Sequence, residues 1–251
     1  MSDLTGLTAV VTGGNSGLGL AMATGIGRAG ARVVIWARDR ERSSAAVEAL
    51  ARLGIAAFSV RCDIGEESDV QNAMAETLAR AGQVDCLVAN AGTAAAAALS
   101  DTSLAQWRQV LRTNLDGTFL TCRAAAEHMI ERGRGGSLIV VSSLIARYGG
   151  AGQIAYATSK SGLIGLGRTL AVELARYRIR CNLLLPGWFA TPMNAALQAN
   201  ERFMQATTQR TPVRRWAEPR ELEAVAAFLA DPALVFHTGN EVVVDGGYSI
   251  F

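Results

Sequence analysis

The sequence predicts a doubly wound α/β fold, in which a parallel sheet of about seven strands has helices on both faces. Short apolar runs alternate with longer segments of helical spacing along all 251 residues. The runs are apolar without interruption, as expected of parallel strands that are covered on both sides. No linker, repeat or change of composition divides the chain, which indicates one domain over residues 1–251.

The elements follow from these patterns in chain order. Strands are predicted at residues 7–12, 32–36, 57–61, 84–89, 137–142, 180–185 and 241–244. Helices are predicted between them at 17–29, 43–53, 66–81, 103–132, 155–177 and 219–229, the last with a proline near its start. Residues 190–215 contain no strand pattern, and we expect a helical flap there.

Composition excludes several classes of protein. The balance of 24 Lys+Arg against 22 Asp+Glu leaves +2, and no basic stripe predicts a nucleic-acid partner. No apolar run reaches the roughly 20 residues that span a bilayer, so no membrane association is expected. The four cysteines are widely separated, which argues against a metal site; they are Cys62, Cys86, Cys122 and Cys181. We expect them to be reduced thiols in a cytoplasmic protein.

A glycine-rich turn, TGGNSGLG at residues 12–19, follows the first strand and opens the first helix. Gly13 permits a tight turn, Gly17 lets the backbone approach a pyrophosphate, and Gly19 lets helix and strand pack closely. The helix N-terminus adds N–H groups and a positive dipole. A purely structural turn is the alternative, but this position favours a dinucleotide site made by Gly13, Asn15, Ser16, Gly17, Leu18 and Gly19.

The TGxxxGxG spacing resembles the short-chain dehydrogenase/reductase family. The resemblance extends over essentially the whole chain through Asn90-Ala91-Gly92, Asn114, Ser143, Tyr156-x-x-x-Lys160, Pro186-Gly187 and Val244-Asp245-Gly246-Gly247. It implies a Rossmann-type oxidoreductase that transfers a hydride between a nicotinamide cofactor and a carbonyl or secondary alcohol. The alternative is a non-catalytic, cofactor-binding scaffold or redox sensor, which would be expected to lack a catalytic residue.

Tyr156 and Lys160 are four residues apart and share one helix face, where they form either an ordinary surface pair or a catalytic one. A phenol with a pKa near 10 is a poor base, and a neighbouring ammonium should lower that pKa. Tyr156 would then act as general acid or base. Ser143 stands thirteen residues before Tyr156, the family spacing, whereas Ser142 should face the other way.

The resemblance also implies roles for residues that the chemistry alone leaves open. Asn114, otherwise a satisfied buried amide, would hold a water in a proton relay to Lys160, which would also bond the nicotinamide ribose. Asp63 would bond the adenine or else close a turn, and Thr191 would lie near the carboxamide or merely start a helix. The remaining cofactor contacts would be Ile64, Asn90, Ala91, Gly92, Tyr156, Pro186 and Gly187.

Residues at the end of the second predicted strand should contact the 2′ position of the cofactor's adenosine ribose. A carboxylate there favours NAD, and an arginine favours the 2′-phosphate of NADP. The family register puts Ala37 at the acidic position and Arg38 after it, although a generic count nominates Asp39. We therefore expect NADP, with NAD as the alternative. The other interpretation of this stretch is that Arg38 is merely exposed to solvent and Asp39 is the N-cap of the next helix.

The substrate pocket should be built by residues 94–99, 144–153 and 188–189 together with the flap. Its expected contacts are Ser143, Leu144, Gln153, Tyr156 and Trp188, while Arg147 either binds substrate or faces solvent. Similar sequences include 3-oxoacyl-thioester reductases, sugar and gluconate dehydrogenases and steroid-type dehydrogenases, and the sequence does not choose among them. Helices rich in Ala, Gly and Leu on several faces predict a homotetramer, with a dimer as second choice.

Overall fold

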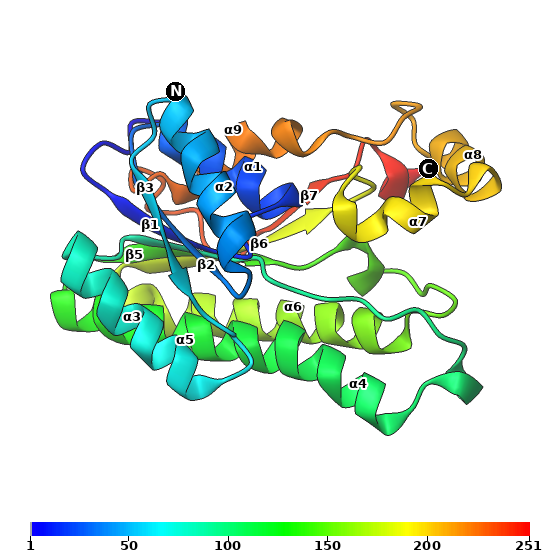
Figure 1. Cartoon of the computed structure of the whole chain (residues 1–251), viewed down its shortest axis with the longest axis horizontal. Helices are drawn as coiled ribbons and strands as arrows, with labels where there is room; N and C mark the ends of the chain where they lie inside the picture. The colour runs from blue at the N-terminus through cyan, green and yellow to red at the C-terminus, as the bar shows by residue number, and fades with distance from the viewer. Residues whose placement is uncertain (1) are drawn as a thin grey trace.

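The computed structural model describes residues 2–251 and contains one parallel sheet in the order β3-β2-β1-β4-β5-β6-β7 (Figure 1). Its strands are β1 (Thr8–Thr12), β2 (Arg32–Ala37), β3 (Ala57–Arg61), β4 (Cys86–Ala89), β5 (Gly136–Val141), β6 (Ile179–Pro186) and β7 (Glu241–Val244). The predicted α/β fold class is confirmed. The order reverses between β1 and β4, and in such sheets ligands bind in the crevice beyond the carboxyl ends of that strand pair.

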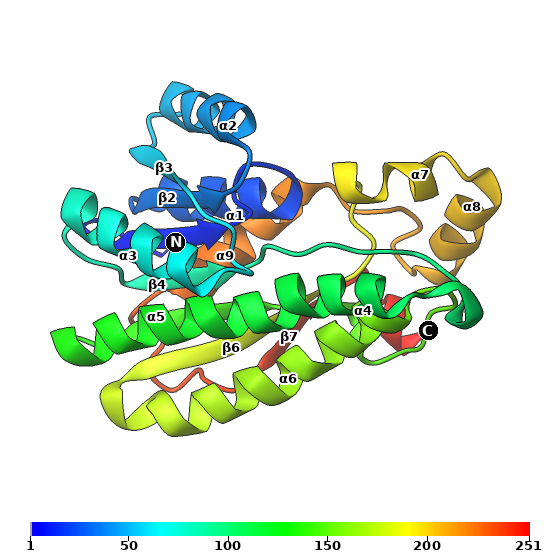
Figure 2. The ribbon, with the colours of Figure 1, turned by 60° about the horizontal axis from the view of Figure 1, so that its bottom comes forward.

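Helices cover both faces of the sheet (Figures 1 and 2). One face carries α1 (Gly17–Arg28), α2 (Arg40–Arg52) and α9 (Glu223–Ala230). The other carries α3 (Glu67–Ala81), α4 (Leu104–Leu111), α5 (Gly117–Arg132) and α6 (Ile154–Leu174). Strand side chains alternate between two cores: Val10 packs in the core that includes α3, α5 and α6, and Ala9 and Val11 pack in the other.

The long helix predicted at 103–132 is wrong as one continuous element. A π-helical turn, Arg112–Asp116, separates α4 from α5. Helical spacing of apolar residues continues through the turn, so the pattern alone does not indicate it. The buried Asn114 amide makes hydrogen bonds to other segments from this turn, which compensates for the irregular backbone.

The helix predicted at 43–53 begins earlier, at Arg40, because Asp39 caps it. The Asp39 carboxylate accepts a hydrogen bond from the Arg42 backbone N–H at 3.0 Å. An Asp in this position satisfies an N–H group that the helix itself leaves free. The Asp39 cap, which belonged to the alternative interpretation of this stretch, is therefore present.

Residues 190–215, which we call the flap, contain α7 (Ala195–Gln198) and α8 (Glu201–Arg210) and no strand. Figure 2 shows α7 and α8 extending away from the sheet at the end where α4 begins and where the C-terminus lies. A short parallel bridge between Phe189 and Ala217 closes the base of the flap. The flap is therefore a helical extension that is attached to the main fold at both of its ends.

Within residues 2–251, none of the helices is both long enough and apolar enough to cross a bilayer. The four cysteines are free thiols and all are buried. Over the same residues, we find no cluster of three or more His, Cys, Asp or Glu side chains arranged to hold a metal ion.

Candidate active site

The glycine-rich turn between β1 and α1 forms a backbone cradle. Gly13 and Gly17 have φ values of +64° and +52°, a region that disfavours side chains. At Gly19, a Cβ would overlap the Gly13 carbonyl oxygen and lie 2.6 Å from Asn90 Nδ2. The turn therefore has space for an approaching ligand only because these positions carry no side chain.

The first turn of α1 suits an anionic group. Ser16 is the N-cap residue but its side chain makes no capping hydrogen bond, and the first turn contains no acidic residue. The helix dipole and uncapped N–H groups therefore fit a dinucleotide pyrophosphate. Asn15 lies nearby with its side chain donating to Ser43 Oγ at 3.2 Å, while Leu18 packs against the core under α1.

Thr12 connects this turn to the loop after β4, a role that the sequence analysis missed. Its Oγ1 accepts hydrogen bonds from the backbone N–H of Asn90 at 2.9 Å and of Ala91 at 3.0 Å. The Asn90 side chain donates in return to the Thr12 carbonyl at 2.9 Å. A hydroxyl residue at the end of a strand, just before the glycines, was the available signal.

Ser143, Tyr156 and Lys160 come together beside this crevice. Ser143 follows β5, and its side chain lies close enough to the Tyr156 hydroxyl to lower the pKa of the phenol. Lys160 Nζ lies 5.7 Å from the centroid of the Tyr156 ring and donates to the Val141 carbonyl at 2.8 Å. Ser142 is buried, and its hydroxyl donates to the Lys160 carbonyl at 2.7 Å, so its hydrogen is already used within the protein.

The expected lowering of the Tyr156 pKa is wrong for this structure. Burial raises the pKa of the Tyr156 phenol, and the nearby Ser143 side chain opposes that rise only in part. Burial also lowers the pKa of Lys160, the only lysine of the sequence, to about 8. Desolvation penalises both charged forms, so at neutral pH the phenol keeps its proton.

Asn114 lies in the π turn next to Tyr156 and Lys160. Its side-chain amide is fully hydrogen-bonded and lies close to Lys160. The Thr93 backbone N–H donates to Asn114 Oδ1 at 2.8 Å. A Cβ at Gly92 would lie 3.3 Å from Asn114 Oδ1 and 3.6 Å from Lys160 Nζ. Both polar atoms therefore border one small space that a side chain at residue 92 would fill.

On the adenosine side, Asp63 both closes a turn and pairs with arginines. Its Oδ1 accepts from the Gly65 N–H at 3.0 Å, and its Oδ2 lies 3.7 Å from both Arg38 and Arg112. Arg38 is exposed at the end of β2, whereas the Asp39 carboxylate is engaged by the start of α2. The group free to meet a ligand at this edge is thus cationic.

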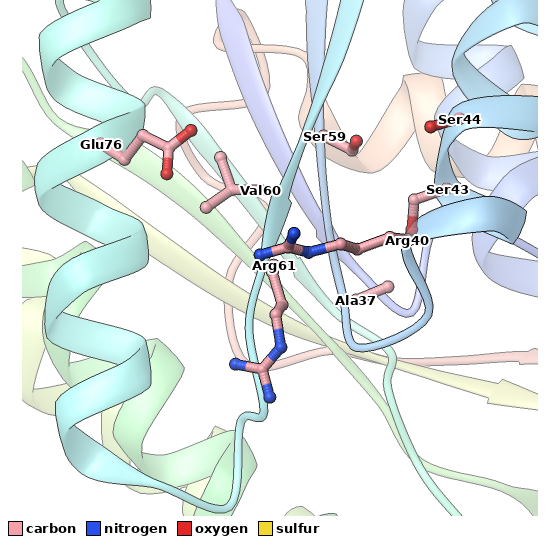
Figure 3. Close-up of a pocket in the computed structure, with 8 residues that line it drawn as sticks. All are labelled: Ala37, Arg40, Ser43, Ser44, Ser59, Val60, Arg61 and Glu76. Atoms are coloured by element: carbon pink, nitrogen blue, oxygen red, sulfur yellow. The ribbon is translucent and has the colours of Figure 1, made fainter.

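A cavity of about 300 Å³ lies beyond Arg38, between α2, β3 and α3. Its walls are Ala37, Arg40, Ser43, Ser44, Ser59, Val60, Arg61 and Glu76, and Figure 3 shows the Arg40 side chain extending from α2 toward Arg61. Arg61 is paired with Asp69 at 3.0 Å. The sequence analysis did not single out Arg40, although it stands two residues after Arg38. Ile64 does not line this cavity; it follows Asp63 in the chain, and its side chain is buried against Gly117.

The loop after β6 closes over the glycine-rich turn. Pro186 ends the strand, and a Cβ on Gly187 would lie 2.7 Å from Asp245 Cα. Thr191 caps the turn that opens the flap, so the helix-start alternative is borne out locally. A Cβ on Gly17 would lie 3.6 Å from the Thr191 side chain, which brings Thr191 to the edge of the dinucleotide cradle.

An aromatic cluster joins the substrate side to the flap. Trp188 stacks on Trp216 with ring centroids 5.0 Å apart and meets Phe203 of α8 edge-on at 5.2 Å. Tyr248, near the C-terminus, also meets Trp188 edge-on at 6.3 Å. The predicted substrate residue Trp188 therefore holds the flap as well.

The polar residues predicted around the pocket differ in their surroundings. Arg147 is exposed, as its solvent-facing alternative predicts, and it donates to Glu241 of β7 at 2.6 Å; Arg168 pairs with the same carboxylate. Gln153 precedes α6, is half-buried, and makes no side-chain cap. Leu144 is buried next to Ser143, close to Gly187.

A doubly wound sheet with a glycine cradle at its switch point and an adjoining Ser-Tyr-Lys group defines the class of nicotinamide-dependent oxidoreductases. Comparison with known proteins agrees. The family model described as "Enoyl-(Acyl carrier protein) reductase" matches residues 13–249. The chain belongs to the short-chain dehydrogenase/reductase family, and it is an oxidoreductase that acts on alcohol or carbonyl groups.

Individual relatives cover nearly the whole chain. A 3-oxoacyl-[acyl-carrier-protein] reductase of Chlamydia pneumoniae is 36% identical over 244 residues, 97% of either chain. A 5-keto-D-gluconate 5-reductase of Escherichia coli is 34% identical over 245 residues, covering 98% of this chain and 96% of its own. A gluconate 5-dehydrogenase structure from Burkholderia cenocepacia, in complex with NADP and tartrate, has 36% identity and a TM-score of 0.95, covering 99% and 97%.

Proposed function

We propose that this protein is an NADP-linked reductase of small ketones, with Tyr156 as the general acid and base. The observation that carries the proposal is that Ser143 and the buried Lys160 both lie beside Tyr156, with Lys160 Nζ 5.7 Å from the centroid of its ring. Retention of all four residues, Asn114 included, argues against a non-catalytic scaffold. Named relatives are reductases and dehydrogenases rather than scaffolds.

In the proposed mechanism, the bound nicotinamide supplies or accepts the hydride, and the protein handles the proton. Ser143 holds the substrate oxygen by a hydrogen bond, and Tyr156 transfers its phenolic proton to that oxygen during reduction. Because burial raises the Tyr156 pKa, the phenol is in the protonated state that reduction requires. In the oxidation direction the phenol must first lose this proton, so oxidation accelerates as the pH rises.

Several residues fit the cofactor by their surroundings. Gly13, Gly17 and Gly19 leave space for the pyrophosphate at the start of α1. In this proposal Lys160 bonds the nicotinamide ribose and Thr191 lies beside the carboxamide. Asp63 and Ile64 lie near the adenine. Asn90, Ala91, Gly92, Pro186 and Gly187 complete this set.

The preference for NADP rests on Arg38. Its guanidinium is exposed and lies 3.7 Å from Asp63, a pairing that a 2′-phosphate can replace. Asp39 does not compete, because its carboxylate accepts from the start of α2. Structures similar to this chain were crystallised with NADP.

We take ketones of sugar acids as the substrate class, on the strength of the gluconate-type relatives and the tartrate in one of them. In this proposal the substrate is contacted by Leu144, Gln153 and Trp188, and it is covered by the flap. The chain acts as one domain in which the flap is the moving part.

We also propose a cytoplasmic homotetramer. Four buried free thiols suit a reducing compartment. Large apolar side chains are exposed in separate regions: Val172 on α6, Val235 and Phe236 in the segment before β7, and Ile250 and Phe251 near the C-terminus. Two different self-complementary patches suffice for a closed tetramer. Multi-angle light scattering at micromolar concentration tests this, and a monomeric mass would refute it.

The test of the proposed function is Tyr156→Phe on a panel of ketones that includes 5-keto-gluconate, a 3-oxoacyl thioester and a neutral cyclic ketone. We expect turnover to fall at least ~100-fold because the proton donor is lost. Affinity for NADPH, measured by its fluorescence, should stay within about twofold of wild type. Near-native turnover of the variant on a verified substrate would refute Tyr156 as the proton donor.

A further inference from the structure

Asn114 is held on two sides by groups outside its own helix. Its Oδ1 accepts from the Thr93 N–H at 2.8 Å, and its Nδ2 donates to the Thr93 carbonyl at 2.9 Å. The second Nδ2 hydrogen goes to Ser159 Oγ at 3.0 Å. Asn114 and Ser159 are both fully buried, so water does not take the place of either partner.

Ser159 stands on α6, three residues after Tyr156 and one before Lys160. Its hydroxyl donates to the Tyr156 backbone carbonyl at 2.7 Å. With its hydrogen used there, the Ser159 oxygen faces the Asn114 amide as an acceptor. The Ser159 hydroxyl thus links the backbone of Tyr156 to the side chain of Asn114 in the π turn.

The position of the Asn114 amide matters because of what lies beside it. Its Oδ1 and Lys160 Nζ border the same small space next to Gly92, at 3.3 Å and 3.6 Å from a Cβ placed there. An acceptor oxygen in this position suits the lysine amine or a water bonded to it, whereas an amide N–H₂ would oppose it. The contact between α6 and the π turn therefore sets the surroundings of Lys160.

We propose that Ser159 is a positioning residue, which holds the Asn114 amide against the helix of Tyr156 and Lys160 so that Oδ1 faces the lysine. It touches neither substrate nor cofactor and acts through Asn114. This inference rests on the proposed function, since it requires Asn114, Tyr156 and Lys160 to form the catalytic group.

The experiment is a double-mutant cycle with Ser159→Ala and Asn114→Ala, measured as kcat, KM and NADPH affinity of the full-length protein. Ser159→Ala removes one buried hydrogen bond at the amide, so we expect kcat to fall roughly 3- to 10-fold. KM and NADPH affinity should stay within about twofold. In the Asn114→Ala background, Ser159→Ala should change kcat by less than about twofold, because the residue through which it acts is gone.

Ser161→Ala is the matched control. Ser161 lies on the same helix, and its hydroxyl also donates to a backbone carbonyl, that of Ala146, but it is exposed. We expect this variant to keep wild-type kcat. Ser159→Cys, which fills nearly the same space with a weaker acceptor, should give a kcat between wild type and Ser159→Ala, and it serves as the test if the alanine variant does not fold.

Effects of Ser159→Ala and Asn114→Ala that multiply in the double variant would overturn the inference. So would a Ser159→Ala variant, or a Ser159→Cys variant, with the kcat of Ser161→Ala. Both outcomes are separate from failure of the proposed function. That failure would appear as turnover retained in Tyr156→Phe, whereas here Tyr156→Phe stays inactive and only the coupling of Ser159 to Asn114 is lost.

Discussion

The dinucleotide side and the substrate side of the crevice are built differently. The first is made of backbone: glycines in the turn after β1, and Thr12 hydrogen-bonded to the loop after β4. The second is made of side chains from distant segments, as where Trp188 packs against Phe203 of the flap and Trp216 beyond it. A backbone cradle admits little variation in sequence, whereas side-chain contacts can be exchanged one at a time.

This difference explains why relatives with one type of chemistry act on different substrates. The sheet, the cradle and the Ser-Tyr-Lys group require particular residues at particular positions. The flap and the loop at residues 93–99 require only that apolar surface be covered. Reductases of an acyl thioester and of a sugar acid are accordingly similar to this chain to nearly the same degree.

The largest effect expected from this contrast is that of Gly19→Ala. The new Cβ would overlap the Gly13 carbonyl and the Asn90 side chain, neither of which has room to move. Overpacking costs about 1–3 kcal/mol, and a clash with backbone belongs at the upper end of that range, so NADPH should bind roughly 100-fold more weakly. Fluorescence titration measures this. Gly165→Ala is the control, since a Cβ there meets nothing within 4 Å, and comparable weakening in both variants would contradict the cradle.

Arg38→Ala tests the side chain that adds selectivity to the backbone cradle. A charge-assisted hydrogen bond contributes on the order of 1.5–3 kcal/mol, so the wild type should prefer NADPH over NADH by ~10- to 150-fold. The variant should lose most of that preference and keep its NADH affinity. Dissociation constants at one salt concentration measure it, with Arg52→Ala, at the far end of α2, as control. An NADH preference in the wild type would show that Arg38 does not decide the cofactor.

Phe203→Ala probes the substrate side. Removing the ring breaks the edge-on contacts with Trp188 and Trp216. Aromatic pairs contribute about 0.5–1.5 kcal/mol each, so KM should rise roughly 2- to 12-fold, while NADPH affinity stays within about twofold. Steady-state kinetics beside the fluorescence titration separate the two quantities. Equal losses in both would mean that the two sides of the crevice are not independent.

The smallest expected difference is one of mobility without any substitution. The flap is attached through side chains and contains the exposed Met193, whereas β1 and β4 are buried and paired on both sides. Amide hydrogens of the flap should therefore exchange faster than those of the strands in the ligand-free protein, and NADPH with substrate should slow them. Hydrogen-exchange mass spectrometry measures this. Equal protection in the two regions would contradict a moving flap.

Most of the fold could be predicted because its signals are local. Each apolar run bounded by glycine or charge became a strand, and the predicted strands at 57–61 and 241–244 have the observed bounds. Asp39 was recognisable as a cap because capping involves only neighbours in sequence. The candidate site was accessible for the same reason, since its motifs have fixed spacing along the chain.

Other features depend on contacts between distant segments. The sequence by itself determined the alternation of strands and helices, the glycine cradle, and the spacing of Ser143, Tyr156 and Lys160 along the chain. Only the tertiary structure decided that the helix through Asn114 breaks, that Arg147 binds Glu241, and that burial raises rather than lowers the Tyr156 pKa. The physical reason is that hydrogen-bond partners, ion pairs and desolvation are set by whatever folds against a residue, which its own stretch of sequence does not contain.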